Sequence, residues 1–187
     1  MKLLILQLSD MHFENEEQVQ SVKIDKMVAA INTVAHADEC IIIISGDMAS
    51  KGKETDYICV KKFVGKLLFE LNKKRFKHKK IHVLTVPGNH DIDFSNLDVN
   101  IKDILKAYED KTVDELKKCY IESMQNYFSY ASEYGFFDDD KIISKKVIEY
   151  GDKKIGFVLC NTAPCLYLMA MQKIWEIIIC LIRNYKR

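Results

Sequence analysis

Three short apolar runs in this sequence each stop at a small cluster of Asp, His or Asn residues. The runs are 3–8, 40–44 and 81–86, and the clusters that follow them are Asp10-Met11-His12, Gly46-Asp47 and Gly88-Asn89-His90-Asp91. Apolar runs of this length, bounded by turn residues such as Pro87, are typical of buried strands. Open α/β sheets place their ligand sites at the carboxyl ends of their strands. The pattern therefore predicts one shared site built from three loops.

The segments between these runs have helical periodicity. Ile24, Met27, Val28, Ile31 and Val34 fall on one helical face, and a second apolar face follows the loop that contains Gly52. Strand, helix and strand in this order favour a right-handed βαβ unit with parallel strands. The four consecutive isoleucines at 41–44 indicate a strand that is covered on both faces, as in a central parallel sheet. The fold class is therefore α/β.

The pattern changes after Asp91. Residues 97–108 and 113–134 are expected to form helices, and the second of these is rich in aromatic residues that we expect to pack against the sheet. Residues 147–150 and 155–160, separated by Gly151-Asp152, predict a β-hairpin. The tail 165–187 is apolar nearly all round if helical, yet Gln172, Lys173 and Glu176 make it a poor membrane span.

Composition limits the class of partner. The chain has 187 residues, enough for one domain, and its net charge of +1 gives no reason to expect a nucleic acid or a membrane as partner. The six Cys residues lack CxxC spacing, which argues against a zinc knuckle or a disulfide framework and favours the reducing cytoplasm. The amino-terminal apolar run leads into Asp10 and His12 without a small-residue cleavage site, so we interpret it as a strand and not as a signal peptide.

The three clusters contain the donor groups of a metal-dependent hydrolase. Asp10 and His12 at a strand end can point at one ion, and the two oxygens of Asp47 can bridge two ions. With Asn89 as an oxygen donor, this mixed set suits Mn, Fe, Zn or Ni. Two ions about 4 Å apart would clamp an in-line displacement at phosphorus and make hydroxide available near neutral pH. An imidazole such as that of His90 can protonate a leaving alkoxide.

The Asp91 carboxylate follows His90 directly in the sequence. A carboxylate can accept the second ring N–H of a histidine and so fix its tautomer. We therefore expect Asp91 to orient His90, and we assign both residues to the catalytic machinery.

Asp10-x-His12, Gly46-Asp47 and Gly88-Asn89-His90-Asp91, each after an apolar strand, together resemble the calcineurin-like metallophosphoesterases. The resemblance covers residues 1–164, and the stretch 45–52 is most similar to a bacterial branch of that family. It implies a βαβ sandwich and a hydrolase of phosphate mono- or diesters with a metal-bound hydroxide as nucleophile. It also implies Asp10 and His12 on one metal, Asp47 bridging, Asn89 on the second metal and His90 as proton donor.

The sequence departs from that family in one respect. Family members carry further histidines in Gly-His and Gly-His-x-His motifs, whereas this chain has no histidine after His90. The second metal site and the second sheet are therefore expected to be incomplete, and we interpret residues 1–164 as a truncated phosphoesterase domain. A shift of the reading frame is one interpretation of the tail 165–187.

Two other hypotheses remain at this point. The chain is a truncated or degenerate phosphoesterase with little or no activity, or it is a non-enzymatic interaction module whose helices after Asp91 bind a partner. A metal titration would distinguish the degenerate phosphoesterase from the interaction module. An assay of phosphate-ester hydrolysis would distinguish both of them from an active enzyme.

Overall fold

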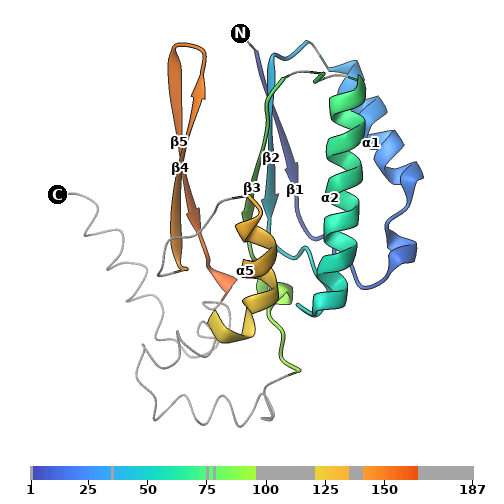
Figure 1. The fold of residues 1–187 in the computed structure, drawn as a ribbon, viewed down its shortest axis with the longest axis vertical. Coiled ribbons are helices and arrows are strands. Elements are labelled where there is room, and N and C mark those ends of the chain that lie inside the picture. The colour runs from blue at the N-terminus through green and yellow to red at the C-terminus, as the bar shows by residue number, and fades with distance from the viewer. Residues whose placement is uncertain are drawn as a thin grey trace, which may run out of the picture.

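The computed structural model describes residues 2–34, 36–74, 76–77, 79–95, 121–134 and 141–163 (Figure 1). The predicted helix over 97–108 and the tail 165–187 lie outside these residues. The elements, in chain order, are β1 (Leu3–Leu8), η1 (Glu16–Gln18), α1 (Ser21–Thr33), β2 (Glu39–Ser45), α2 (Glu54–Lys74), β3 (Ile81–Val86), η2 (Asn89–Asp91), α5 (Gln125–Ser132), β4 (Ile143–Tyr150) and β5 (Lys153–Cys160).

The first three strands form the predicted parallel sheet, in the order β1-β2-β3. In the register, Leu4 of β1 pairs with Cys40 of β2, and Cys40 pairs in turn with Ile81 of β3. The predicted strands 3–8 and 81–86 match β1 and β3, and β2 extends one residue beyond the predicted run at each end. Ile41 and Ile42, which point to opposite faces, are both 0% exposed, so the central strand is covered on both sides.

Helices α1 and α2 lie along one face of this sheet (Figure 1). Their predicted apolar faces form the larger core cluster, to which β2 contributes Ile42 and Ile44. The described part of the predicted helix 113–134 contains α5, which begins at Gln125 after Met124. Its Tyr127 and Tyr130 are 0% exposed and lie against Tyr57 of α2, with ring centroids 6.4 and 5.7 Å away. Tyr127 and Tyr130 are thus core residues, and these ring contacts are with helix α2, whereas the prediction placed the aromatic residues against the sheet.

The opposite face of the parallel sheet is covered by the predicted hairpin (Figure 1). Strands β4 and β5 pair antiparallel around the turn Gly151-Asp152, and a second core cluster joins Ile41 and Leu84 of the parallel sheet to Ile148 and Leu159 of the hairpin. The result is an α/β sandwich of helices, a three-stranded sheet and a two-stranded sheet. Among the described residues, none of the helices is both long enough and apolar enough to cross a bilayer.

Candidate metal centre

The loops after β1 and β2 continue side by side beyond the ends of their strands. The backbone N–H of His12 donates to the carbonyl of Asp47 at 3.0 Å, and that of Phe13 donates to the carbonyl of Met48 at 2.9 Å. A parallel bridge between Phe13 and Ala49 extends this pairing. These bonds bring the first two sequence clusters together, as the sheet order predicted.

Three of the predicted metal ligands have a left-handed backbone. The φ angles are 54° at Asp10, 47° at His12 and 49° at Asp47, and Lys141 is the other non-glycine residue with positive φ in the described part of the chain. This conformation costs about 1–3 kcal/mol for a non-glycine residue and persists only where surrounding contacts enforce it. Such strain is typical of functional sites, and here it coincides with the residues that the sequence selected.

The loop after β3 is pressed against Asp47. A Cβ atom placed on Gly88 would lie 2.1 Å from Oδ1 of Asp47 and 2.5 Å from its backbone nitrogen, so any other residue at position 88 would displace this carboxylate. The backbone N–H of His90 also donates to Oδ1 of Asp47 at 2.9 Å. Gly88 therefore allows the second and third clusters to meet.

The side chains of His12, Asp47 and His90 form a group that can hold a metal ion. Their donor atoms lie within 4.8 Å of one another. Among the described residues, these three side chains form such a group of potential metal ligands. The rings of His12 and His90 are 4.6 Å apart and nearly perpendicular, at 85°. Two imidazoles and a carboxylate fit Mn, Fe, Zn or Ni, so the residues present are chemically suited to a divalent metal.

This group overlaps only in part with the predicted ligand set. It contains His12 and Asp47, and it adds His90, which the sequence assigned to proton donation. Asp10 is exposed and is outside the group, although its backbone N–H donates to the Gly46 carbonyl at 3.3 Å in the same pair of loops. Asn89 precedes His90 in η2, and both side chains line one pocket.

The ring of His90 is oriented by a backbone carbonyl. Nδ1 of His90 lies 2.9 Å from the carbonyl oxygen of Ser50. Because a carbonyl can only accept, Nδ1 carries a hydrogen and Nε2 is the nitrogen left for a ligand or a proton. The predicted contact between Asp91 and the His90 ring is therefore wrong. Ser50, which the sequence analysis did not select, occupies that position.

Asp91 is instead buried beneath the site, 0% exposed. Its carboxylate accepts hydrogen bonds from the backbone N–H groups of Ala49 (2.9 Å) and Gly88 (2.8 Å) and from the hydroxyl of Tyr57 (2.8 Å). Burial raises the pKa of Asp91, and these hydrogen bonds oppose that shift. Burial raises the pKa of Tyr57 well above its usual value, and the neighbouring Asp91 carboxylate adds to this effect.

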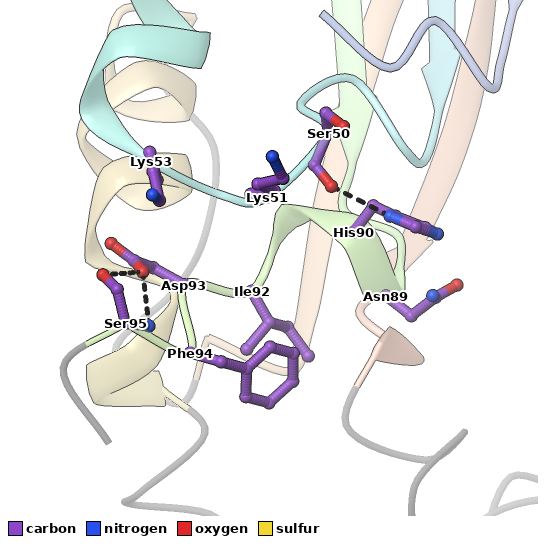
Figure 2. Close-up of a pocket in the computed structure, with 9 residues that line it drawn as sticks. All are labelled: Ser50, Lys51, Lys53, Asn89, His90, Ile92, Asp93, Phe94 and Ser95. Atoms are coloured by element: carbon purple, nitrogen blue, oxygen red, sulfur yellow. Dashed lines mark hydrogen bonds between the residues drawn. The ribbon is translucent and has the colours of Figure 1, made fainter. Parts of the chain in front are cut away.

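A pocket of about 600 Å³ opens beside the donor group (Figure 2). It lies between the loop containing Ser50 and Lys53 and the segment from Asn89 to Ser95. Figure 2 shows the side chains of Asn89 and His90 at one side of the pocket and the ring of Phe94 below Ile92. Lys51 at its rim pairs with Glu14. The pocket offers room for a ligand directly beside His90.

The fold and the donor group define an α/β protein with a candidate transition-metal site at the carboxyl end of its parallel sheet. The sequence matches the family model of calcineurin-like phosphoesterases over residues 3–174, and the chain belongs to this family. It is also 32% identical over 89 residues to a protein of Ruthia magnifica subsp. Calyptogena magnifica named "Probable cyclic nucleotide phosphodiesterase". That alignment covers 47% of this chain and 33% of the relative, so the chain spans about a third of that protein.

Proposed function

We propose that this chain is a metal-dependent hydrolase of phosphate esters. The observation that carries the proposal is the convergence of His12, Asp47 and His90 within 4.8 Å, in a chain that belongs to a phosphoesterase family. Both phosphate monoesters and diesters are candidate substrates, and the name of the Ruthia relative supports diesters. The adjacent pocket of about 600 Å³ would accept the organic part of the ester.

Two divalent ions are assigned to the site by this proposal. Asp10 and His12 would hold the first ion, Asp47 would offer its carboxylate to both ions, and Asn89 would offer its amide oxygen to the second. Manganese, iron, zinc and nickel all suit these donors. When bound, the ions would supply a hydroxide nucleophile near neutral pH and neutralise charge that develops on the phosphate.

His90 acts as the proton donor in this proposal. Its Nδ1–H is held by the Ser50 carbonyl at 2.9 Å, which leaves Nε2 for the proton that passes to the leaving alkoxide. Ser50 thus has a positioning role that depends on its backbone and not on its side chain.

The state of the cysteine thiols supports an assignment of the cellular compartment. In the described part of the chain, Cys59 and Cys160 are free thiols. Free thiols, one of them exposed, fit a reducing environment, and we assign the protein to the cytoplasm on this basis.

Hydrolysis of bis(p-nitrophenyl) phosphate in the presence of manganese tests the function. We expect turnover that EDTA abolishes and manganese restores. Manganese binding without turnover would support a degenerate phosphoesterase, and the absence of both would support an interaction module. Either result contradicts the proposed activity.

A second assay tests the role of His90. His90→Asn should reduce hydrolysis of an ester with a poor leaving group by ~10²–10⁴-fold, because that alkoxide needs a proton. The activated nitrophenyl ester should lose less. Equal losses on both substrates, accompanied by an equal loss of manganese affinity, would show that His90 is a metal ligand instead.

A further inference from the structure

We propose that Tyr57 and Asp91 form a positioning pair that fixes the separation of the loops carrying Asp47 and His90. The inference rests on the proposed function, because it concerns the geometry of that same site. Neither residue is assigned to substrate or metal contact here. Both act through the loops that they hold.

The Asp91 carboxylate joins three segments that are distant in the sequence. Oδ1 accepts from the backbone N–H of Ala49 and from the Tyr57 hydroxyl, and Oδ2 accepts from the backbone N–H groups of Gly88 (2.8 Å) and Met48 (3.3 Å). Met48 directly follows Asp47, and Asp91 directly follows His90. A shift of this carboxylate would therefore move Asp47 and His90, two of the three residues of the candidate donor group.

Tyr57 anchors this network to the helical layer. It lies in α2, is 2% exposed, and its ring packs against Tyr130 of α5 with a centroid distance of 5.7 Å. Its hydroxyl is a side-chain donor to Asp91 at 2.8 Å, whereas Met48, Ala49 and Gly88 donate from the backbone. A backbone donor can be removed only by substitution with proline, which also constrains the backbone, so Tyr57 is the position at which the network can be weakened selectively.

Burial of Asp91 determines what the loss of the Tyr57 hydrogen bond costs. A buried carboxylate that loses one of its donors keeps an unsatisfied lone pair in a medium of low dielectric, which is costly. Part of that cost can be relieved by moving Asp91 toward water, and this movement disturbs both loops. Groups that orient metal ligands from behind typically change metal affinity by 10–100-fold when they are removed.

Tyr57→Phe is the test, and Tyr130→Phe is the matched control. Both variants remove one hydroxyl from a buried tyrosine in the same aromatic cluster. Hydrogen exchange of the metal-free chain should become faster at the amides of Met48, Ala49 and Gly88 in Tyr57→Phe only. Calorimetric titration should show manganese binding weakened by about 10-fold in Tyr57→Phe and unchanged in Tyr130→Phe.

Unchanged exchange at these three amides in Tyr57→Phe would overturn the proposal, and so would an equal effect of Tyr130→Phe. A purely structural role of Tyr57 would lower the melting temperature and leave the manganese affinity of the folded protein as it is. Neither readout requires turnover, so the absence of phosphoesterase activity would refute the proposed function without deciding this inference. If the chain bound no manganese, the amide exchange alone would decide it.

Discussion

The two ends of the parallel sheet both carry histidines and carboxylates, but among the described residues these side chains form a three-residue group at the carboxyl end alone. At the carboxyl end, donor atoms of His12, Asp47 and His90 lie within 4.8 Å of one another. At the amino end, His36 lies 3.6 Å from Asp38, and His82 lies 3.7 Å from Glu39, as two separate pairs. Residue types alone therefore do not distinguish a candidate metal centre from an ordinary sheet edge.

The difference lies in the backbone beneath the side chains. The carboxyl-end loops contain three non-glycine residues with positive φ, and the buried Asp91 carboxylate holds two of these loops together. Among the described residues, no non-glycine residue at the amino end of the parallel sheet has a positive φ angle. His36 and Asp38 there have side chains that are 73% and 37% exposed. Strained loops held by buried hydrogen bonds are thus what separates the two ends.

The largest effect is expected from Asp47→Asn. As the proposed bridge between two ions, Asp47 should matter more for manganese affinity than Asp10, His12 or Asn89. We expect a loss of more than about 100-fold, beyond the usual effect of residues behind the ligands. Calorimetric titration measures it, with Glu39→Gln at the amino end as the control that should bind like the parent. If Asp47→Asn binds manganese normally while Asp10→Asn does not, the bridging role is wrong.

Gly88→Ala should break the contact between the second and third loops. The added Cβ would meet Oδ1 of Asp47 at 2.1 Å, so the carboxylate has to move, at a cost of about 1–3 kcal/mol in stability and with weaker manganese binding. Gly156 in β5 is the control, because a Cβ there meets no atom within 4 Å and its φ is not positive. Gly156→Ala should keep the affinity and change stability by less than about 1 kcal/mol. Urea unfolding and metal titration of both variants would show whether the close approach at Gly88 matters.

Alkaline pH should lower the free energy of unfolding through Tyr57, which lies beneath the carboxyl end of the parallel sheet. The pKa of Tyr57 is raised well above 10.0 by burial and by Asp91, so above pH 10 the unfolded chain releases a proton that the folded chain retains. The stability that Tyr57 contributes is therefore complete below pH 10 and falls by about 1.4 kcal/mol per pH unit above it. Urea unfolding of Tyr57→Phe should show a shallower decline between pH 10 and 11 than the parent. Parallel declines would indicate that this hydroxyl is not buried.

The smallest change in stability is expected from Asp38→Asn, at the amino end of the parallel sheet and at acid pH. The backbone N–H of Lys2 donates to the exposed Asp38 carboxylate at 2.6 Å and lowers the pKa of that group. Its contribution to stability is present above the unfolded pKa and disappears as pH falls through the lower folded value. Asp38→Asn should flatten the acid limb of the stability profile slightly and leave manganese affinity unchanged. A change in affinity would mean that the two ends of the sheet are coupled.

Periodicity and strand-end patterns predicted the fold well. The parallel strands, the helix between the first two and the hairpin all appear, because each depends on local apolar spacing and turn residues. The shared location of the three clusters also followed, since parallel strands end at one edge. Local patterns could not reveal which side chains touch.

Contacts between the loops are the part that the sequence did not predict. Ser50, and not Asp91, faces the ring of His90, because Asp91 is drawn beneath the loops by Met48, Ala49 and Gly88. In the sequence, Tyr57 is one residue of the apolar helical face that follows the loop containing Gly52. A tyrosine at a fully buried helical position was the available signal, because its hydroxyl needs a partner.

An anomalous difference map from crystals soaked in manganese tests the central claim most directly. We expect a peak at the carboxyl end of the parallel sheet, within ligand distance of His12 and Asp47, and no peak beside His36 or His82. A map without density at His12 and Asp47, or with its strongest peak at the amino end, would contradict the assignment of this edge of the sheet as the metal centre.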